Sequence, residues 1–437
     1  MELYKSCLKV RNRLGWAGFP RQSHPFVWQY NQIRMTILAD KHILLGVTGS
    51  IATYKAADLA SKLTQAGAQV DVILTPSAEK FITPLTFQSV TGRKAFTDSD
   101  LWGGEAHVLH VGLGHGSDLL VVAPCTANTL GKLAHGIADN LLTITALAAR
   151  CPVLVAPAMD VGIYTNPATQ ANIRTLMERG VFFAGPGEGR MASGLTGLGR
   201  LLEPSELLGH VRRALGLSGP LAGRKVVVTA GGTQEPLDPV RVLTNRSSGK
   251  QGYAVAQAAI DSGAGVVLVS APTALTPPVG AKFIPVETAA EMLEAVLAES
   301  AGADGLIMAA AVADFRPARI AGNKLKKRDG IPQVDLEAAP DVLAAVAGLG
   351  ARRPRRVIGF AAESVDLHEN AKAKLKSKKL DMIVANDISA ADAGFGVDTN
   401  RVTFLFPDSE DELLPLLSKD EVAETLIARF AMLLESK

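Results

Sequence analysis

Apolar segments typical of buried strands alternate with amphipathic helical segments along most of the chain, and this alternation restricts the possible folds more than any other feature. A helix is predicted at 52–66, between the first two strands. The predicted strands of the first half are 42–48, 68–75, 118–124, 152–159 and 181–186. Strands that are apolar throughout and separated by helices are typical of a parallel sheet covered on both faces. We therefore expect an α/β fold.

The same alternation starts again near residue 220, after a predicted helix at 205–217 and a cluster of Gly and Pro. The strands of the second half are predicted at 225–233, 265–270, 305–311, 356–363 and 381–387, with helices at 249–262 and 370–379. A chain of 437 residues is also too long for one ordinary core. We predict two Rossmann-like three-layer domains with mostly parallel sheets, at 35–202 and 221–437, joined by a linker helix region at 203–220.

Residues 1–34 differ from the rest, because they carry six Lys and Arg but one acidic residue and show no regular apolar period. We interpret this extension as a disordered tail or a mis-assigned translation start, with Met35 as the natural one. The whole chain has a net charge of +2, which argues against binding nucleic acid through bulk charge. Three cysteines and no long apolar segment predict a cytoplasmic protein without disulfides or a membrane span.

Small and hydroxyl-bearing residues follow three of the predicted strands of the first half. Gly49 and Ser50 follow the first strand, Thr75 and Ser77 the second, and 123–128 a later one. Open α/β sheets bind ligands at the carboxyl ends of their strands, where helix N-termini present free amides to phosphate. The segment after the first strand, at 46–56, lacks the pattern GxGxxG, so a dinucleotide is disfavoured as the ligand. Taken together, the three strand ends predict one phosphate-bearing ligand.

Several longer motifs of the first half resemble the homo-oligomeric flavin-containing cysteine decarboxylases. They are GVTGSIATYKAADL (46–59), FITPLTFQSVTG (81–92), HVGLGHGSDLLVVAPCTANTLGKLAHGIADNLL (110–142), PAMDVGIYTNPATQANI (157–173) and ASGLTGLGRL (192–201). The resemblance implies bound FMN and decarboxylation of phosphopantothenoylcysteine to phosphopantetheine. The FMN-binding residues that it implies are Gly49, Ser50, Ile51, Thr75, Ser77, Pro124, Thr126 and Asn128.

His110 matches the active-site histidine of that family. An imidazole titrates near neutrality, which suits proton transfer beside the substrate. His107 and His115 are interpreted as surface or loop residues, and the three histidines lack the Cys or carboxylate that would complete a metal site. Cys125 is interpreted as a small filler and Cys151 as a core residue.

Two positions differ from the family pattern, and both are predicted to be catalytic. Asp160 stands where the family usually has an asparagine that can bind the substrate carboxylate. An ionised aspartate would repel that carboxylate, so it must be protonated, turned away, or bridged by a cation or water. Ser193 stands where decarboxylases of this pathway usually carry a flap cysteine that supplies a proton. A serine is a much weaker acid, so an oxidised enethiol is an alternative product.

The second half carries residues suited to phosphate chemistry. A Gly-Gly-Thr turn follows its first strand, and Ser247, Ser248, Gly249 and Lys250 begin a helix. Without the spacing GxxxxGK[ST], this is not a P-loop, and a capped helix with an exposed lysine is the simpler interpretation of this segment alone. Asp314 beyond a strand end, lysines at 324, 326 and 327, and a lysine-rich helix at 370–379 favour a polyphosphate with a divalent cation.

These motifs resemble the phosphopantothenate–cysteine ligase domain, over about 221–430. The resemblance implies that CTP and Mg²⁺ activate phosphopantothenate as an acyl-cytidylate, which cysteine then attacks. It gives Lys324 the neutralisation of charge, Asn245 the conversion of the acyl-cytidylate, and Asp314 the metal and nucleotide site. The further CTP-pocket residues that it implies are Met308, Ala309, Ala310, Pro340, Asp341, Val342, Leu343, Phe360, Lys374 and Lys378.

Taken together, the two resemblances predict a bifunctional enzyme of coenzyme A biosynthesis, a family in which the two domains are fused in this order. The predicted partners are phosphopantothenate, cysteine and CTP. Trimeric flavin domains and dimeric ligase domains in the family imply a homo-oligomer, up to a dodecamer. Two alternatives stay open: an active ligase whose flavin half stops at an enethiol, and a flavin domain that is a non-catalytic scaffold. The histidine at position 110 argues against the scaffold.

Overall fold

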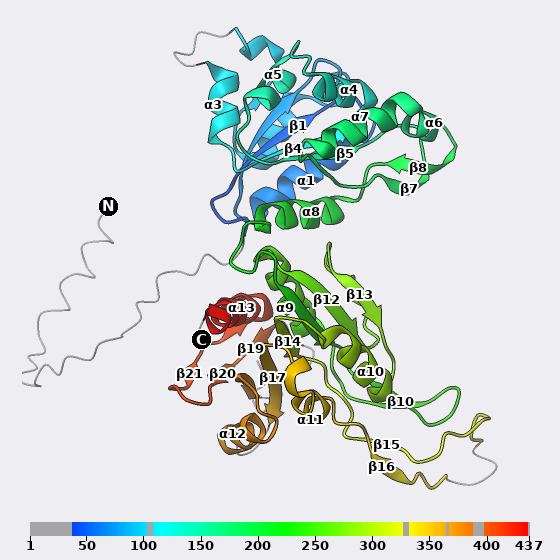
Figure 1. Cartoon of the computed structure of the whole chain (residues 1–437). Helices are drawn as coiled ribbons and strands as arrows, with labels where there is room; N and C mark the ends of the chain where they lie inside the picture. The colour runs from blue at the N-terminus through cyan, green and yellow to red at the C-terminus, as the bar shows by residue number, and fades with distance from the viewer. Residues whose placement is uncertain (1–36, 103–107, 327–331, 364–366, 388–396, 436–437) are drawn as a thin grey trace, which may run out of the picture. The chain divides into compact units, whose positions relative to one another are not determined.

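The computed structural model describes residues 37–102, 108–326, 332–363, 367–387 and 397–435 (Figure 1). The extension predicted for 1–34, His107 and Lys327 lie outside the described residues. Within the described residues, no helix is long and apolar enough to cross a bilayer.

A parallel sheet of six strands forms the centre of the first half, in the order β3-β2-β1-β4-β5-β6. Its strands are β1 His42–Val47, β2 Gln69–Leu74, β3 Ala95–Phe96, β4 Leu119–Cys125, β5 Val153–Pro157 and β6 Phe182–Phe183. The helices are α1 Thr53–Gln65, α2 Pro84–Thr91, α3 Leu109–Gly116, α4 Ala127–His135, α5 Leu141–Ala148, α6 Val161–Thr165, α7 Pro167–Glu178 and α8 Pro204–Gly216. A hairpin of β7 Gly187–Arg190 and β8 Thr196–Arg200 follows β6.

Both faces of this sheet are buried, because successive side chains of each apolar strand point to opposite faces. Every residue of β4 is buried. Leu59 of α1 and Leu207 of α8 belong to the core on one face. Leu130 of α4 and Ile173 of α7 belong to the core on the other. The result is the three-layer arrangement predicted from the sequence.

The sheet of the second half has eight strands in the order β13-β12-β9-β14-β17-β18-β20-β21. The first six are parallel, and β20 and β21 are antiparallel additions at one edge. The strands are β9 Lys225–Ala230, β12 Gly265–Ser270, β13 Lys282–Pro285, β14 Gly305–Met308, β17 Arg356–Glu363, β18 Met382–Asp387, β20 Val402–Leu405 and β21 Glu412–Leu413.

Helices cover this second sheet on both faces, and three short ladders accompany it. The helices are α9 Lys250–Asp261, α10 Ala289–Ser300, α11 Val342–Ala347, α12 Leu367–Ser377 and α13 Lys419–Glu435. The ladders pair β10 Gln234–Pro236 with β11 Val242–Thr244, β15 Phe315–Pro317 with β16 Leu336–Ala338, and β19 Thr399–Asn400 with β22 Leu417–Ser418. Gly305 in β14 makes room for Phe430 of α13, since a Cβ at Gly305 would lie 2.2 Å from the ring.

The predicted α/β class with mostly parallel sheets is confirmed, whereas several element bounds were wrong. The strand predicted at 181–186 is only β6, because the chain turns at Gly185, where φ is +79°. The helix predicted at 370–379 is α12, which begins at Leu367 and ends at Ser377. The antiparallel strands and the short ladders were not predicted, since such short segments carry little periodic signal.

Cys125 and Cys151 lie inside the first half, as predicted from the sequence. Cys125 is fully buried at the end of β4. Burial raises the pKa of its thiol, so this side chain behaves as an apolar filler. Cys151 is half-buried against the core.

Glu424 of α13 makes the stability of the fold dependent on pH. Its Oε2 is buried without a hydrogen-bond partner among the described residues. Burial raises the pKa of the carboxyl from its ordinary value of 4.5 to about 8. The folded chain therefore keeps a proton that the unfolded chain loses above its lower pKa, and stability falls as pH rises through this interval.

We expect Glu424→Gln to remove this pH dependence, because the amide stays neutral. Urea unfolding at about pH 5 and about pH 9 measures it, with Glu435→Gln, at an exposed position of the same helix, as the control. The gain in stability of Glu424→Gln over the wild type should be larger at the higher pH. An equal difference at both pH values would contradict the assignment.

Candidate active sites

The first candidate site lies where the order of the first sheet reverses, between β1 and β4. Thr48, directly after β1, donates its hydroxyl to the carbonyl oxygen of Pro124 at 2.7 Å. The same hydroxyl accepts the backbone N–H of Thr126 at 3.0 Å. Thr48 is buried, so these two bonds fix the loop after β4 against the end of β1. In open α/β sheets, this reversal point is where ligands bind.

The chain after β2 is held close to the chain after β1 by a glycine. A Cβ at Gly49 would lie 2.5 Å from Cβ of Ser77, so only glycine lets the chain after β1 approach the chain after β2 this closely. The helix α1 that follows has no side-chain cap, and its amides at Thr53 and Lys55 donate to the carbonyl oxygens of Ser50 and Ala52. The hydroxyl of Ser50 accepts the N–H of Ala52 at 3.2 Å.

The other predicted FMN residues lie around the same edge of the sheet. Thr75 is buried, and its hydroxyl accepts the N–H of Ala78. Thr126 caps α4. Ile51, Ser77 and Asn128 are exposed. Gly49, the start of α1 and several hydroxyls form a cradle that suits the phosphate of FMN, and the exposed Ile51 is available to cover an apolar ring.

Asp160 and Ser193, the two positions that differ from the family pattern, are hydrogen-bonded to each other. Ser193 Oγ donates to Asp160 Oδ2 at 2.6 Å. The second carboxylate oxygen accepts the N–H of Gly162 at 2.9 Å and caps α6. The hydrogen bond from Ser193, together with that from Gly162, lowers the pKa of Asp160. The carboxylate is therefore ionised and turned toward Ser193, which argues against the protonated alternative.

The hairpin that carries Ser193 is also held by its backbone. Met159 donates its N–H to the carbonyl oxygen of Gly199 in β8 at 2.9 Å. A Cβ at Gly199 would lie 2.2 Å from the carbonyl oxygen of Met159, and φ of Gly199 is +147°. The hairpin and the loop after β5 thus pack backbone against backbone. Ser193 lies in the turn of this hairpin, between β7 and β8.

His110 lies in the first turn of α3 and is partly exposed. Helix α3 precedes the central strand β4, while the hairpin β7–β8 follows the edge strand β6. Figure 1 shows α3 and this hairpin on opposite flanks of the first sheet. Within one chain, His110 is thus set apart from the Asp160–Ser193 pair.

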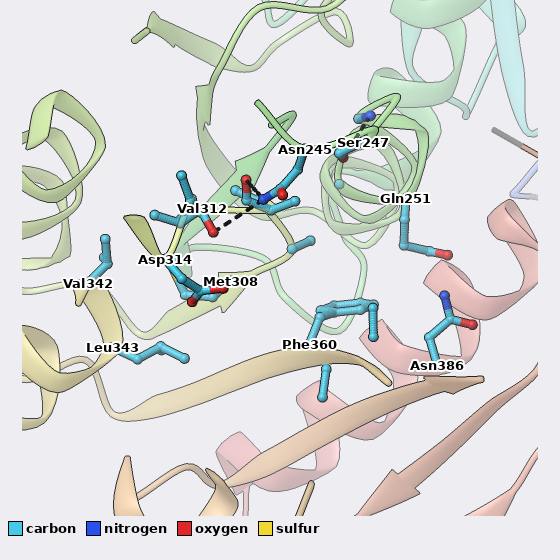
Figure 2. A pocket seen from close by; sticks show the side chains of 18 of the residues that line it. Asn245, Ser247, Gln251, Met308, Val312, Asp314, Val342, Leu343, Phe360 and Asn386 are labelled. Atoms are coloured by element: carbon cyan, nitrogen blue, oxygen red, sulfur yellow. Dashed lines mark hydrogen bonds between the residues drawn. The ribbon is translucent and has the colours of Figure 1, made fainter. Parts of the chain in front are cut away.

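The second candidate site is a pocket of about 710 Å³ in the second half (Figure 2). It lies beside the ends of β9 and β14, where the order of the second sheet reverses. Figure 2 shows Val342 and Leu343 at one end of the pocket and Gln251 and Asn386 at the other, with Phe360 between them. The sequence-predicted residues that line it are Asn245, Met308, Ala309, Ala310, Asp314, Pro340, Asp341, Val342, Leu343, Phe360, Lys374 and Lys378.

Hydrogen bonds with three polar side chains fix the loop after β14. Thr229 Oγ1 accepts the N–H of Ala310 at 3.1 Å, and Thr233 Oγ1 accepts the N–H of Ala313 at 2.9 Å. Both threonines are buried. Asn245 Nδ2 donates to the carbonyl oxygen of Ala311 at 3.1 Å (Figure 2). The loop therefore presents a defined backbone edge to the pocket.

Lys374 and Lys378, from the lysine-rich segment predicted as a helix at 370–379, line the pocket. Lys374 donates to the carbonyl oxygen of Phe360 at 3.2 Å. Lys378 forms an ion pair with Asp341, which also caps α11. Burial alone would raise the pKa of Asp341, but the hydrogen bond from Lys378 and that from Ala344 hold it below its ordinary value.

Lys324 is the one predicted CTP residue that does not line this pocket. It is exposed, and its neighbour Leu325 is held by Asp238 and Arg241. Asp314 lines the pocket with an exposed side chain. Among the residues that the structure describes, no three of His, Cys, Asp and Glu gather to hold a metal ion. A Mg²⁺ here would need oxygens of substrate phosphates beside the carboxylate of Asp314.

Four residues at one end of the pocket were not predicted from the sequence. These residues are Gln251, Asn386, Asn400 and Lys419. Gln251 directly follows Lys250 in the helix start predicted at 247–250, so its position was a usable signal. Asn400 lies in β19 and Lys419 begins α13. No sequence motif connected either element with the pocket.

Two protein-family models match the chain, one to each half. A family described as "Flavoprotein" matches residues 33–216. A family described as "DNA/pantothenate metabolism flavoprotein C-terminal domain" matches residues 221–433.

Curated proteins similar to the chain carry the name "Coenzyme A biosynthesis bifunctional protein CoaBC". The protein of Bacillus subtilis (strain 168) is 46% identical over 401 residues, which cover 91% of this chain and 98% of that one. The protein of Vibrio vulnificus (strain YJ016) is 44% identical over 403 residues, with coverage of 92% and 100%. That of Mycobacterium tuberculosis (strain ATCC 25618 / H37Rv) is 43% identical over 401 residues, with coverage of 89% and 95%.

Solved structures similar to the chain match one half each. The C-terminal domain of a CoaBC protein is 40% identical and covers 50% of this chain and 100% of its own, with a TM-score of 0.44. A mutant PPC decarboxylase complexed with pantothenoylaminoethenethiol is 35% identical and covers 40% of this chain and 97% of its own, with a TM-score of 0.37.

Gly49 offers a direct test of the flavin cradle. We expect Gly49→Ala to reduce bound flavin several-fold, because the new Cβ must push the chain after β2 away from the strand ends. The ratio of flavin to protein absorbance in the purified variant measures this. Gly116→Ala, where a Cβ meets no atom within 4 Å, is the control. Equal flavin content in both variants would contradict the cradle.

Proposed function

This chain belongs to the family of bifunctional coenzyme A biosynthesis proteins, and from that premise we propose which of its residues carry each half-reaction. It takes part in coenzyme A biosynthesis as a decarboxylase and a ligase, with FMN as the cofactor of its flavoprotein half. The pocket beside β9 and β14 is the observation that best supports this assignment of residues. With the exception of Lys324, the expected CTP residues gather there.

The ligase half joins cysteine to phosphopantothenate at the expense of CTP. A carboxylate is a poor electrophile, so the reaction first forms a bond between the phosphopantothenate carboxylate and the α-phosphorus of CTP, and pyrophosphate leaves. The amine of cysteine then attacks the acyl carbon, and CMP leaves with the electron pair of the broken acyl–phosphate bond. Both steps place negative charge on phosphate oxygens, which fixed cations and amides stabilise.

The residues of the pocket divide this work by their chemistry. Met308, Phe360 and Leu343 supply apolar contacts to the base, and the fixed backbone beyond β14 supplies amides and carbonyls to its edge. Lys374 and Lys378 offset phosphate charge. Asp314 would hold Mg²⁺ together with the phosphates, and Lys324 would reach the same charge from its exposed segment. Asn245 orients the acyl group.

The flavoprotein half then removes carbon dioxide from phosphopantothenoylcysteine and yields phosphopantetheine. When bound, FMN supplies the oxidation and later reduction of the thiol carbon that make this loss of carbon dioxide possible. His110 exchanges a proton with the substrate.

Asp160 and Ser193 act as a pair that fixes the hairpin β7–β8 over the substrate. The ionised carboxylate is engaged by Ser193 and Gly162, which draws its charge away from a substrate carboxylate. The hydrogen bond from Ser193 to Asp160 fixes the turn of the hairpin. A cysteine at position 193 would instead offer its thiol for proton transfer. The full decarboxylation remains the proposed outcome, with another group as the final proton donor.

We further propose a homo-oligomer in the cytoplasm, up to a dodecamer. Exposed apolar side chains on the paired arms β10–β11 and β15–β16 support this, since soluble proteins seldom leave such side chains uncovered together. They include Val242, Leu243, Phe315 and Leu336. The separation of His110 from the Asp160–Ser193 pair also supports a flavin site that neighbouring subunits complete.

His110→Asn tests the flavin half. We expect loss of carbon dioxide release from phosphopantothenoylcysteine by at least about a hundredfold, the usual contribution of a positioned acid or base, with FMN still bound. Mass spectrometry of the product and the flavin spectrum measure the two properties. His115→Asn, at an exposed position of the same helix, is the matched control. Unchanged turnover of His110→Asn would remove its catalytic role.

Asn245→Ala tests the ligase half. We expect pyrophosphate release from CTP and phosphopantothenate to continue, while cysteine-dependent release of CMP falls strongly, because the amide acts on the acyl-cytidylate. Separate assays of pyrophosphate and CMP measure the two steps. Equal loss of both would show instead that Asn245 mainly holds the loop through Ala311.

A further inference from the structure

The ligase pocket extends beyond the residues expected to bind the nucleotide. At the end that Gln251 and Asn386 mark in Figure 2, its wall also includes Lys250, Asn400 and Lys419. Lys250 comes from the first turn of α9, and Lys419 from the first turn of α13. Two helix starts and two lysines therefore meet at one end of a single cavity.

Hydrogen bonds between amide side chains hold this end of the pocket together. Asn400 Nδ2 donates to Gln251 Oε1 at 2.8 Å, and Gln251 Nε2 donates to the carbonyl oxygen of Lys419 at 3.0 Å. Asn400 is 3% exposed and Lys419 is 8% exposed. The start of α13 is thus tied to the start of α9, and the two lysines are kept near each other by structure rather than by chance contact.

The two positive charges at this end of the pocket repel each other. Lys250 forms an ion pair with Asp398 at 2.6 Å, and the carboxylate is largely exposed. Lys419 Nζ donates to the carbonyl oxygen of Val397, the residue before Asp398, at 2.5 Å. Burial lowers the pKa of Lys419, and the nearby charge of Lys250 lowers it further, while Asp398 raises it. An anion in the pocket would relieve their repulsion.

The backbone at the start of α9 adds to the same preference. Gly249, with φ of +76°, provides no side-chain cap, so amides of the first turn remain available to a ligand. A Cβ at Gly252 would lie 2.6 Å from Cβ of Ala230, which keeps this turn against the end of β9. Uncapped helix amides beside two lysines are suited to a phosphate group.

We propose that Lys419 and Lys250, with the first turn of α9, form a phosphate-binding subsite of the ligase pocket. This inference rests on the proposed ligase function and extends it to Lys419, which lies more than 160 positions after Lys250 in the chain. Two phosphates of the reaction share this chemistry. One is the terminal diphosphate of CTP, which leaves as pyrophosphate, and the other is the phosphate monoester of phosphopantothenate.

Lys419→Met tests the subsite, because methionine keeps an apolar stem and removes the charge. We expect KM to rise about tenfold for the substrate whose phosphate binds there, as for loss of one charge-assisted hydrogen bond. The other substrate and cysteine should keep their KM values. A rise for CTP together with weaker inhibition by pyrophosphate assigns the diphosphate, and a rise for phosphopantothenate alone assigns the monoester. Lys419→Arg should restore most of the affinity.

The matched control is Lys376→Met, which removes an exposed lysine of α12 that does not line the pocket. KM values for both phosphate-bearing substrates within about twofold of the wild type in folded Lys419→Met would overturn the proposal. A wild-type protein without pyrophosphate release would instead contradict the ligase proposal itself.

Direct binding keeps the test independent of turnover and of the folding of Lys419→Met. Calorimetry with inorganic pyrophosphate and with phosphopantothenate, each added alone to the full chain, compares the wild type with Lys250→Met. We expect at least one ligand to bind the wild type and to bind Lys250→Met about tenfold more weakly. Equal binding of each ligand to both proteins, or binding of neither to the wild type, would overturn the subsite.

Discussion

Buried threonines at the ends of the first strands tie together the loops on which both candidate sites depend. Thr48 after β1 bonds to the chain at Pro124 and Thr126, beyond β4. In the second half, Thr229 and Thr233 bond to the loop beyond β14. In each sheet the two connected strands are those between which the strand order reverses. A hydroxyl that is buried there satisfies loop amides or carbonyls that would otherwise be unpaired, and so leaves the outer amides of the loop for a ligand.

Much of this arrangement was predictable from the sequence, because the parallel strands are apolar throughout and the ligand-binding turns follow them directly. Gly49 was found from its place at a strand end, and Met308 was found through the resemblance of its motif to the ligase domain. Lys419 was not, since its approach to Lys250 depends on tertiary packing between α13 and α9 rather than on any local pattern. The exposed arms and the antiparallel edge were missed for a related reason: strands of two to four residues carry too few side chains for a period to be recognised.

Asp160 and Ser193 show how two unusual residues can make one consistent structure. Considered separately, the aspartate would repel the substrate carboxylate, and the serine would be a poor proton donor. Considered together, the serine hydroxyl donates to the carboxylate and the carboxylate caps a helix, so neither group is left without a partner. The lowered pKa of Asp160 follows from these bonds. In the proposed function, His110 and a further proton donor other than a flap thiol carry out the proton transfers of this half.

The most direct test is mass spectrometry of one incubation of the full chain with phosphopantothenate, cysteine, CTP and Mg²⁺, with and without added FMN. We expect phosphopantetheine to accumulate, because the proposed function keeps both half-reactions and the bond between Ser193 and Asp160 draws the carboxylate away from the substrate. Accumulation of phosphopantothenoylcysteine, or of the oxidised enethiol, would contradict the proposed decarboxylation to phosphopantetheine. Either product would still support the proposed ligase reaction.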